Sequence, residues 1–565
     1  MAIGRNKNAA ADSAYDVVIA GASLDAVVLA GALARSGLTV ALFDQDGVLG
    51  GAHRPRPLLP EHSSARAGAR AGARAGLAPL GPRGIHPAVA RALDLEAHGL
   101  VMVPAAPPAL LSQTGPGLTL SRNGRETTAR LDALKAGEGA RFHHLRATIA
   151  RLRTLSAPFL VEPPLDPAAL RARSARQVQD RLAAAARLGE DTLFDLLNLA
   201  GASCADRLRV DLQAPALRTL LSALALAHQN AGPMAPGSAL GLLNLPLLDG
   251  SGPDAGQGSL WFGAQVQGGA AALSAALESS LSAAGVDLFL ETDVSEILVA
   301  DGKVQGVSLW DGRQVPSHLV VSGHDMKRTV LDLIPSKALP GDLVRMVGRA
   351  DSVGRVARLA VSVGSLEFLP PAWRTDFPSQ ICITDGVAAM EAAGDDAREG
   401  RLPTAPWLSV SLESGAVPGA DPDEGPRTGA VLMVSAHFAP DQFHDGGWTD
   451  ARRDAFRDVV LERMGSLWPR FPSAVEAVTV WLPTDLASET GRTGGALLAG
   501  DWAPDRLYWN RPVPVLARHL CAVEGLVLCG PDMAVLPNEP GVAGLALGAR
   551  LATGVSEKLR IRQVP

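Results

Sequence analysis

The chain has 565 residues, a length that corresponds to roughly three to four average domains or to one large interleaved fold. Hydrophobic residues make up 47% and charged residues 19%, which excludes a disordered or coiled-coil chain. The formal net charge is −6, basic and acidic residues are mixed along the chain, and aromatic residues are only 4%. No nucleic-acid partner is therefore expected, because neither a basic surface nor a stacking platform is present.

The first apolar segment begins at Tyr15, after a polar start unlike a secretory signal. Residues 16–21 are typical of a short buried strand, residues 24–36 of a helix that ends before Gly37, and residues 38–43 of a second strand. Gly21, Ser23 and Asp25 interrupt what would otherwise resemble a membrane span. The pattern therefore predicts a βαβ unit and no transmembrane helix.

The turn inside this unit reads Gly21-Ala-Ser23-Leu-Asp25-Ala26 and stands where a GxGxxG dinucleotide fingerprint would stand. Gly21 suits the tight turn, Ser23 is small enough for a close approach to a diphosphate, and Ala26 allows the helix to pack on the strand. Asp25 does not suit this interpretation, because a carboxylate in the first helical turn would compete with the diphosphate for the helix N-terminus. At ~5 Å and a dielectric of ~20, two unit charges repel by roughly 3 kcal/mol.

Asp44 follows the second strand, 23 residues after Gly21, where an acidic side chain binds a ribose diol. The pair Gly50-Gly51 and the nearby Arg54 then suit a second close approach of the backbone to phosphates. A helix cap followed by a solvated arginine is the alternative interpretation. The order strand, loop, helix, strand, acid and Gly-Gly favours a nucleotide-binding architecture.

These residues resemble the N-terminus of the phytoene desaturase and flavin amine oxidase superfamily, especially the branch of pyridine nucleotide-disulfide oxidoreductase domain-containing protein 2. The stretch VQGGAAAL at 266–273 is similar to that branch's GGMGAL turn. Further similar stretches follow in the family's order at 286–297, 302–323, 406–410, 482–486, 493–495, 511–514 and 524–530. The resemblance covers nearly the whole chain, from Tyr15 to about Leu559.

Two segments depart from the family pattern. Ala499 stands where the family has a histidine before Gly-Asp. The family's short His-Pro-Gly-Gly-Gly loop is replaced by the longer, proline-containing segment 531–542, and a proline lacks the N–H that would contact a cofactor. The sequence Gly541-Val542-Ala-Gly544 and the helix after it are retained, so a helix N-terminus that can face the cofactor is expected.

The resemblance implies an α/β fold: a Rossmann-like FAD-binding domain of the glutathione-reductase type with an interleaved α+β substrate domain. The FAD-binding domain is expected to comprise residues 14–100, 261–335 and 485–560, and the substrate domain residues 101–260 and 336–484. The expected FAD contacts are Gly21, Ser23, Ala26, Asp44, Gly50, Gly51, Arg54, Val294, Gly530, Asp532, Gly541 and Val542. No catalytic side chain is nominated, because removal of a hydride by a flavin demands no acid or base.

Other chemistries find little support. The four cysteines, Cys204, Cys382, Cys521 and Cys529, lack CxxC spacing, which favours buried thiols in a reducing cytoplasm. The histidines, among them His324 at the end of a predicted strand, do not show metal-ligand spacing, so no metal is expected. A serine-hydrolase GxSxG elbow is absent.

Two functions follow from the sequence. The first is an FAD-dependent oxidoreductase acting on an apolar or amphipathic small-molecule substrate. The second is a flavin-fold protein that has lost FAD or catalysis and serves as a structural or regulatory subunit, as a homo-oligomer or paired with an active paralogue. Membrane contact is at most peripheral, because no basic amphipathic helix is evident.

Overall fold

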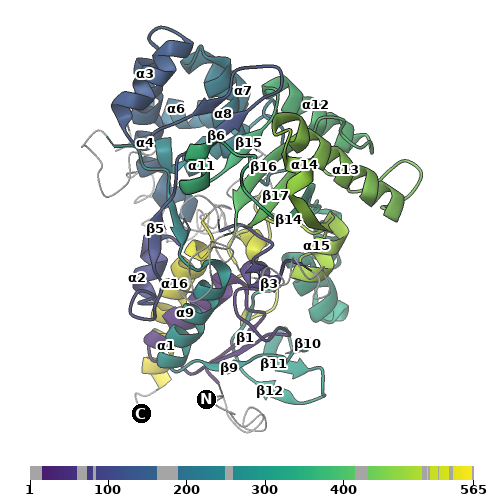
Figure 1. The fold of residues 1–565 in the computed structure, drawn as a ribbon. Coiled ribbons are helices and arrows are strands. Elements are labelled where there is room, and N and C mark those ends of the chain that lie inside the picture. The colour runs from purple at the N-terminus through teal and green to yellow at the C-terminus, as the bar shows by residue number, and fades with distance from the viewer. Residues whose placement is uncertain are drawn as a thin grey trace.

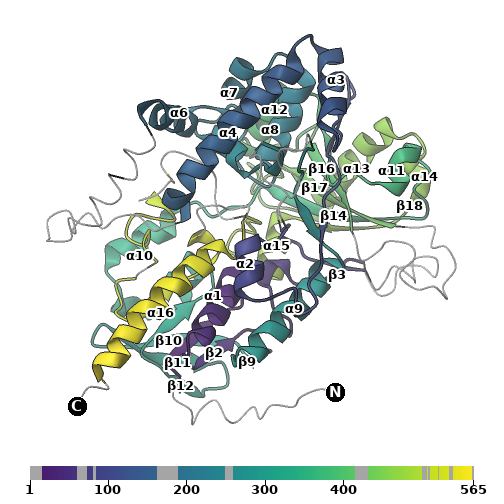
Figure 2. The same cartoon turned by 90° about the vertical axis from the view of Figure 1, so that its left-hand side faces the viewer.

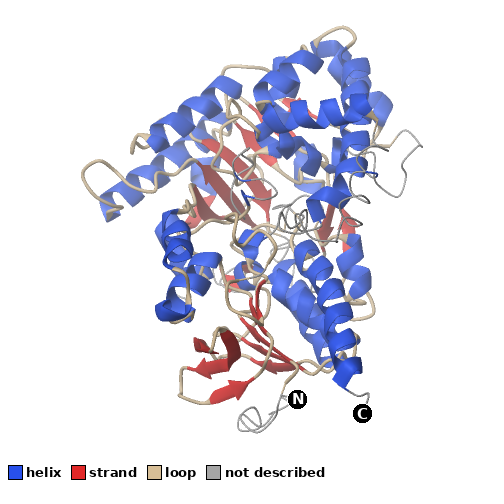
Figure 3. Cartoon of the chain, turned by 180° about the vertical axis from the view of Figure 1, so that it is seen from behind, coloured by secondary structure: helices blue, strands red, loops and turns tan. Residues whose placement is uncertain are grey.

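The computed structural model describes residues 15–59, 73–80, 84–161, 183, 189–248, 259–413, 430–498, 506, 510–519, 521–533 and 539–562. Within these ranges the chain forms two large sheets with helices around them (Figures 1 and 3). Ala499 and residues 534–538, which belong to the two departures from the family pattern, lie outside the described residues.

The first sheet has five parallel strands in the order β19-β13-β1-β2-β9. Its strands are β1 (Val17–Ala20), β2 (Val40–Phe43), β9 (Asp287–Phe289), β13 (Val320–Ser322) and β19 (Leu526–Leu528). The short apolar strands β1, β2, β13 and β19 are buried on both faces, as expected for a parallel sheet, while the edge strand β9 is half-buried. The α/β fold predicted from the sequence is confirmed.

Helices cover one face of this sheet and a three-stranded meander covers the other (Figure 2). The helical face carries α1 (Leu24–Arg35), α2 (Pro87–Ala92), α9 (Gly269–Ala283) and α16 (Val542–Arg562), and the meander consists of β10 (Val294–Ala300), β11 (Lys303–Leu309) and β12 (Gln314–Pro316). Helices α1 and α16 run side by side although their sequences are about 500 residues apart.

The second sheet has seven strands in the order β18-β14-β17-β16-β15-β6-β7. They are β6 (Ala109–Leu111), β7 (Leu118–Thr119), β14 (Val356–Val363), β15 (Ile381–Ile383), β16 (Trp407–Leu412), β17 (Ala430–His437) and β18 (Val475–Trp481). All neighbours pair antiparallel except β6 and β15. One face packs on α13 (Asp450–Leu467) and α14 (Phe471–Ala474).

The other face of the second sheet meets a helical layer and two short ribbons. The helices are α3 (Gly124–Leu134), α4 (Glu138–Val161), α6 (Glu190–Gly201), α7 (Cys204–Asp211), α8 (Pro215–Ala225) and α12 (Val387–Arg398). The ribbons pair β3 (Arg56–Pro57) with β4 (Arg74–Ala75), and β5 (Met102–Pro104) with β8 (Ala264–Val266). Helices α10 (Gly341–Arg349), α11 (Pro371–Thr375) and α15 (Pro483–Thr490) complete the layers.

No described helix is both long and apolar enough to cross a membrane. The cysteines are all unpaired; Cys204, Cys382 and Cys529 are buried and Cys521 is half-buried.

Candidate functional site

The carboxyl ends of β1 and β13 define the place where a doubly wound sheet binds its ligand. The chain leaves β1 toward β2 on one side, while β13 lies on the other side, so the strand order reverses here. We call residues 21–25 and 323–325 the switch point. Gly21 makes the turn after β1 with φ +92°, a conformation that glycine tolerates and other residues rarely adopt, and its N–H donates to Phe43 O at 2.8 Å.

Ser23 and Asp44 are engaged within the protein. Ser23 is the N-cap of α1; its Oγ accepts from Ala26 N at 3.3 Å and donates to Cys529 O at 3.4 Å. Asp44 accepts from Ala22 N through Oδ2 and from Asp46 N at 2.8 Å through Oδ1. Burial raises the pKa of Asp44, and the two N–H donors oppose that shift. Both residues stand where the sequence places them, beside the first turn.

The Gly50-Gly51 segment packs directly on that turn. Gly51 has φ +54°, and a Cβ added to it would lie 3.2 Å from Ser23 Cα. Because glycine has no Cβ, the backbone at Gly51 lies closer to the first turn than a residue with a side chain would easily permit. Arg54, predicted to hold phosphates, forms an ion pair with Asp46 and donates to Gly51 O at 3.4 Å.

Asp25 points away from the N-terminus of its own helix, contrary to the expectation that it would compete with a diphosphate there. Its Oδ1 accepts from Gly541 N at 3.0 Å and from Gly544 N at 3.1 Å. The carboxylate thus caps α16, because the close packing of α1 on α16 brings the two segments together. The expectation that this helix N-terminus faces the cofactor is corrected accordingly, because the N–H groups of Gly541 and Gly544 donate to Asp25 and that of Val542 donates to Glu539 O. Burial raises the pKa of Asp25 to about 6, although these hydrogen bonds lower it.

His324 covers the glycine of the first turn. A Cβ added to Gly21 would lie 2.8 Å from His324 Cε1 and 2.9 Å from Nε2. Burial, with a smaller contribution from Arg328, lowers the pKa of His324 to about 3, so the ring is neutral. The sequence shows this histidine at a strand end but does not reveal that β13 lies beside β1, so it does not predict the contact.

Charged groups gather behind this contact. Asp532 accepts from Met326 N at 2.8 Å, and Asp325 accepts from Thr493 N at 2.8 Å. The pKa of Asp532 is raised by burial and by the neighbouring Asp325. Arg492 donates to Ala496 O at 3.2 Å, and its charge acts on Asp25, Asp325 and Asp532. Asp532 is expected from the sequence, whereas Arg492 is not, because no motif marks it.

The remaining predicted contacts lie around the switch point, except Val294, which lies on the other face of the sheet. Gly530 packs on His324, since a Cβ there would lie 1.8 Å from His324 O. Ala26 is buried under Gly323 and Val542 begins α16. Gly50 adopts φ +116° in the segment that leads to Gly51. Val294 opens β10 and is buried on the meander side of the sheet. The structure therefore brings Gly21, Ser23, Asp44, Gly51, Gly530 and Gly541 to the switch point, with Val294 on the opposite face from α1.

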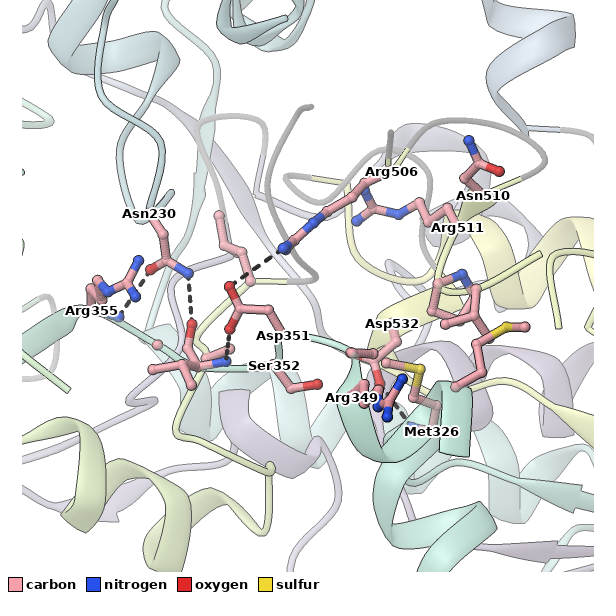
Figure 4. Close-up of a pocket in the computed structure, with 18 of the residues that line it drawn as sticks. Asn230, Met326, Arg349, Asp351, Ser352, Arg355, Arg506, Asn510, Arg511 and Asp532 are labelled. Carbon is pink, nitrogen blue, oxygen red and sulfur yellow. Dashed lines mark hydrogen bonds and ion pairs between the residues drawn. The ribbon is translucent and has the colours of Figure 1, made fainter. Parts of the chain in front are cut away.

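A cavity of about 770 Å³ lies next to the switch point (Figure 4). We call it the larger cavity, to distinguish it from a smaller one described below. Met326, which follows the switch point in the chain, lines the larger cavity together with Asp532 and with Val356 at the start of β14. Its charged lining residues are Arg345, Arg349, Arg355, Arg506, Arg511, Asp342, Asp351 and Asp532. Arg506 pairs with Asp351 at 3.4 Å. The volume lies within the usual range of ~300–1,000 Å³ for small-molecule sites.

No group of three metal-ligating side chains occurs among the described residues.

The backbone of the switch point suits an FAD diphosphate, but the side chain of His324 does not. Gly21, Gly51 and the start of α1 form the close approach that a diphosphate needs. His324 occupies the space against Gly21, and Asp25 takes the α16 donors. A bound dinucleotide therefore requires the His324 ring to turn aside, while Asp25 can stay on α16.

Comparison with known proteins supports the resemblance drawn from the sequence. The proteins named pyridine nucleotide-disulfide oxidoreductase domain-containing protein 2 of Rattus norvegicus and Mus musculus are 27% and 26% identical to this chain, covering 91% of it and 89% of each relative. No family model matches. The resemblance to this branch is thereby confirmed.

Solved structures share the fold. A putrescine oxidase mutant has a TM-score of 0.57 at 15% identity, and an oxidoreductase from Methanosarcina mazei has 0.54 at 15%; each covers 96% of this chain and 99% of its own. Cyclohexylamine oxidase from Brevibacterium oxydans has 0.53 at 16%, covering 97% and 99%. The chain therefore has the fold of FAD-dependent oxidoreductases.

Proposed function

We propose that this protein is an FAD-dependent oxidoreductase, phytoene desaturase-like, that acts on an apolar or amphipathic small molecule. The observation that carries the proposal is the larger cavity, which reaches Met326 and Asp532 at the carboxyl ends of β13 and β19. Ligands of open α/β sheets bind at that edge. A bound flavin would supply the hydride acceptor.

The protein's own residues would position both molecules. Gly21, Ser23 and Gly51 would approach the diphosphate, and the free lone pairs of Asp44 would accept from a ribose hydroxyl. Met346, Val353 and Leu497 give the larger cavity an apolar wall, and Arg349 and Arg506 give it a cationic part. An amphipathic substrate matches this lining.

A second candidate is favoured by His324 and Asp25. His324 fills the space against Gly21, and Asp25 accepts from the N–H groups at the start of α16. The switch point is thus packed and hydrogen-bonded without any ligand, as expected for a flavin-fold protein that has lost its cofactor. Such a protein would act as a structural or regulatory subunit, as a homo-oligomer or paired with an active paralogue.

The absorption spectrum of the purified chain tests the first function. The expected result is a flavin spectrum, either as purified or after incubation with FAD and desalting, and release of free FAD on denaturation. A chain that remains colourless in both cases would contradict the enzyme hypothesis. Co-purification from the native host then tests the second function: a lone flavin-loaded species with turnover would remove its basis.

A further inference from the structure

Strands β14, β17 and β16 are neighbours in the seven-stranded sheet (Figure 1). A row of polar side chains crosses them. Arg358 of β14 pairs with Ser435 of β17, and Ser435 pairs with Ser409 of β16, so the three share one register line. Side chains alternate between the two faces of a strand. Their chain neighbours, such as Leu359 and Val434, pack in the apolar cluster under α13. The row therefore lies on the face away from α13.

Around Ser409, at one end of the row, the hydrogen bonds show which atoms donate and which accept. The His228 N–H donates to His437 Nδ1 at 3.3 Å, which assigns the His437 proton to Nε2 and makes it a donor to Ser409 Oγ at 2.9 Å. Gln380 Nε2 also donates to Ser409 Oγ, at 2.7 Å. Because this oxygen accepts twice, the hydroxyl hydrogen of Ser409 is left for another partner.

Arg358 is the charged member of the row. Its residue is 6% exposed, Nη1 donates to Ser435 Oγ, and Nε has no hydrogen-bond partner. Burial lowers the pKa of Arg358 to about 10, opposed by the more distant Glu413, so the guanidinium is charged at pH 7. In the part of the chain that the structure describes, no carboxylate lies within ion-pair distance of it. A buried cation without a counter-ion is strongly unfavourable, so the position favours an incoming anion.

These groups line a second cavity of about 170 Å³, the smaller cavity. Arg358, Ser409, Ser435 and Gln380 form its polar part, and its apolar lining includes Leu224, Ala227, Leu245, Leu247 and Phe262. An apolar cavity of ~150 Å³ is large enough for benzene. Among the described lining residues only His228 is shared with the larger cavity. His228 has φ +66°, a strained backbone conformation of the kind found at functional sites.

We propose that the smaller cavity binds a small monocarboxylate, with the carboxylate on the Arg358 guanidinium and the Ser409 hydroxyl and an apolar group of about phenyl size against the leucine and phenylalanine wall. One guanidinium edge and one hydroxyl match the two oxygens of a carboxylate. A phosphate would need more donors than this part of the cavity offers. The site does not depend on FAD, and among its described lining residues it shares only His228 with the larger cavity.

Calorimetric titration of the purified full-length chain with benzoate tests the proposal directly. Benzyl alcohol, of the same size and uncharged, serves as the matched ligand. Benzoate should bind at least tenfold more tightly than benzyl alcohol, and added chloride at equal concentration should not displace it. Equal binding of the two ligands, displacement by chloride, or absence of benzoate binding at millimolar concentration would each overturn the proposal.

Two variants locate the ligand. Arg358→Met keeps an unbranched apolar stem but removes the guanidinium and its charge, and it should weaken benzoate binding at least tenfold. Arg355→Met is the control, because Arg355 lines the larger cavity and pairs with Asp441 at 3.0 Å; it should leave benzoate binding unchanged. Loss of binding in the control instead would place benzoate in the larger cavity. If Arg358→Met does not fold, the ligand pair on the wild-type chain still decides. None of these readouts depends on flavin content, so failure here and failure of the proposed function are distinguishable.

Discussion

The two sheets differ in how their polar groups are satisfied. At the switch point of the parallel sheet, Asp44 and Asp25 accept from backbone N–H groups and the neutral ring of His324 lies against Gly21. On the polar face of the antiparallel sheet, Arg358 keeps its charge and its Nε has no partner. The region with the recognisable nucleotide motif is therefore complete without a ligand, whereas the region without a motif has an unmet donor.

This difference shows that a motif and an unmet interaction are separate kinds of evidence. A motif reports which backbone conformations the sequence permits. Buried polar groups without partners report what the folded chain lacks, because such groups are rare and costly. The following substitutions disturb the closed switch point in order of decreasing effect.

Gly544→Ala should have the largest effect on stability. A Cβ at Gly544 would lie 1.9 Å from Asp25 O, a backbone atom, so α16 would have to move away from α1 and from the Asp25 carboxylate. We expect a loss of about 3 kcal/mol in the free energy of unfolding, measured by chemical denaturation. Gly348→Ala on α10 is the control; no atom lies within 4 Å of its Cβ, and a gain of about 0.5 kcal/mol is expected. Equal effects of the two variants would contradict the close packing.

Asp25→Asn should remove a pH dependence. The folded-state pKa of Asp25 is about 6 against an ordinary 3.8, so the folded chain binds more protons than the unfolded chain between these values. The free energy of unfolding therefore falls as pH rises from about 4 to 6. The amide keeps an acceptor for α16, and we expect up to about 3 kcal/mol of added stability at pH 7 with little change at pH 4. Denaturation at both pH values measures this, with the exposed Asp332→Asn as control.

Asp25→Asn also bears on flavin binding. Since the carboxylate lies on α16 and not at the start of α1, the variant should leave the FAD dissociation constant unchanged. A marked gain in FAD affinity would instead mean that the carboxylate faces the diphosphate.

His324→Ala should open the switch point. Removal of the ring frees the space against Gly21, and the dissociation constant for FAD should fall at least tenfold, which corresponds to about 1.4 kcal/mol. Titration of FAD by fluorescence quenching measures it, with the exposed His318→Ala as control. An unchanged dissociation constant would show that His324 does not limit FAD binding and would remove one of the two observations that favour the cofactor-poor function.

Ser23→Gly should have the smallest effect. Glycine is nearly as good an N-cap as serine, so the cost in stability is a few tenths of a kcal/mol. The variant also removes the hydrogen bond to Cys529 O and restores the second glycine of the fingerprint. A modest gain in FAD affinity, additive with that of His324→Ala, is expected in the same titration.

Local sequence patterns predicted the parts of the fold that depend on neighbouring residues. The run from β1 through Gly21 and α1 to β2 and Asp44 is present as predicted, because strand, turn and helix propensities act within a few residues. The resemblance to a flavoprotein family predicted the α/β class. Arg358 had a visible signal, a cation inside the apolar run 356–363, but its isolation from carboxylates was not readable there.

Long-range contacts decided the chemistry of both regions. Gly21 meets His324 because β1 and β13 are parallel neighbours, and Asp25 meets Gly541 because α1 packs on α16. Arg358, Ser435 and Ser409 form a row only through the register of three strands. The sequence by itself therefore determined a flavoprotein-type fold with its glycine turns. Only the tertiary structure decided which charges those turns and strands leave paired or open, because the partners come from distant parts of the chain.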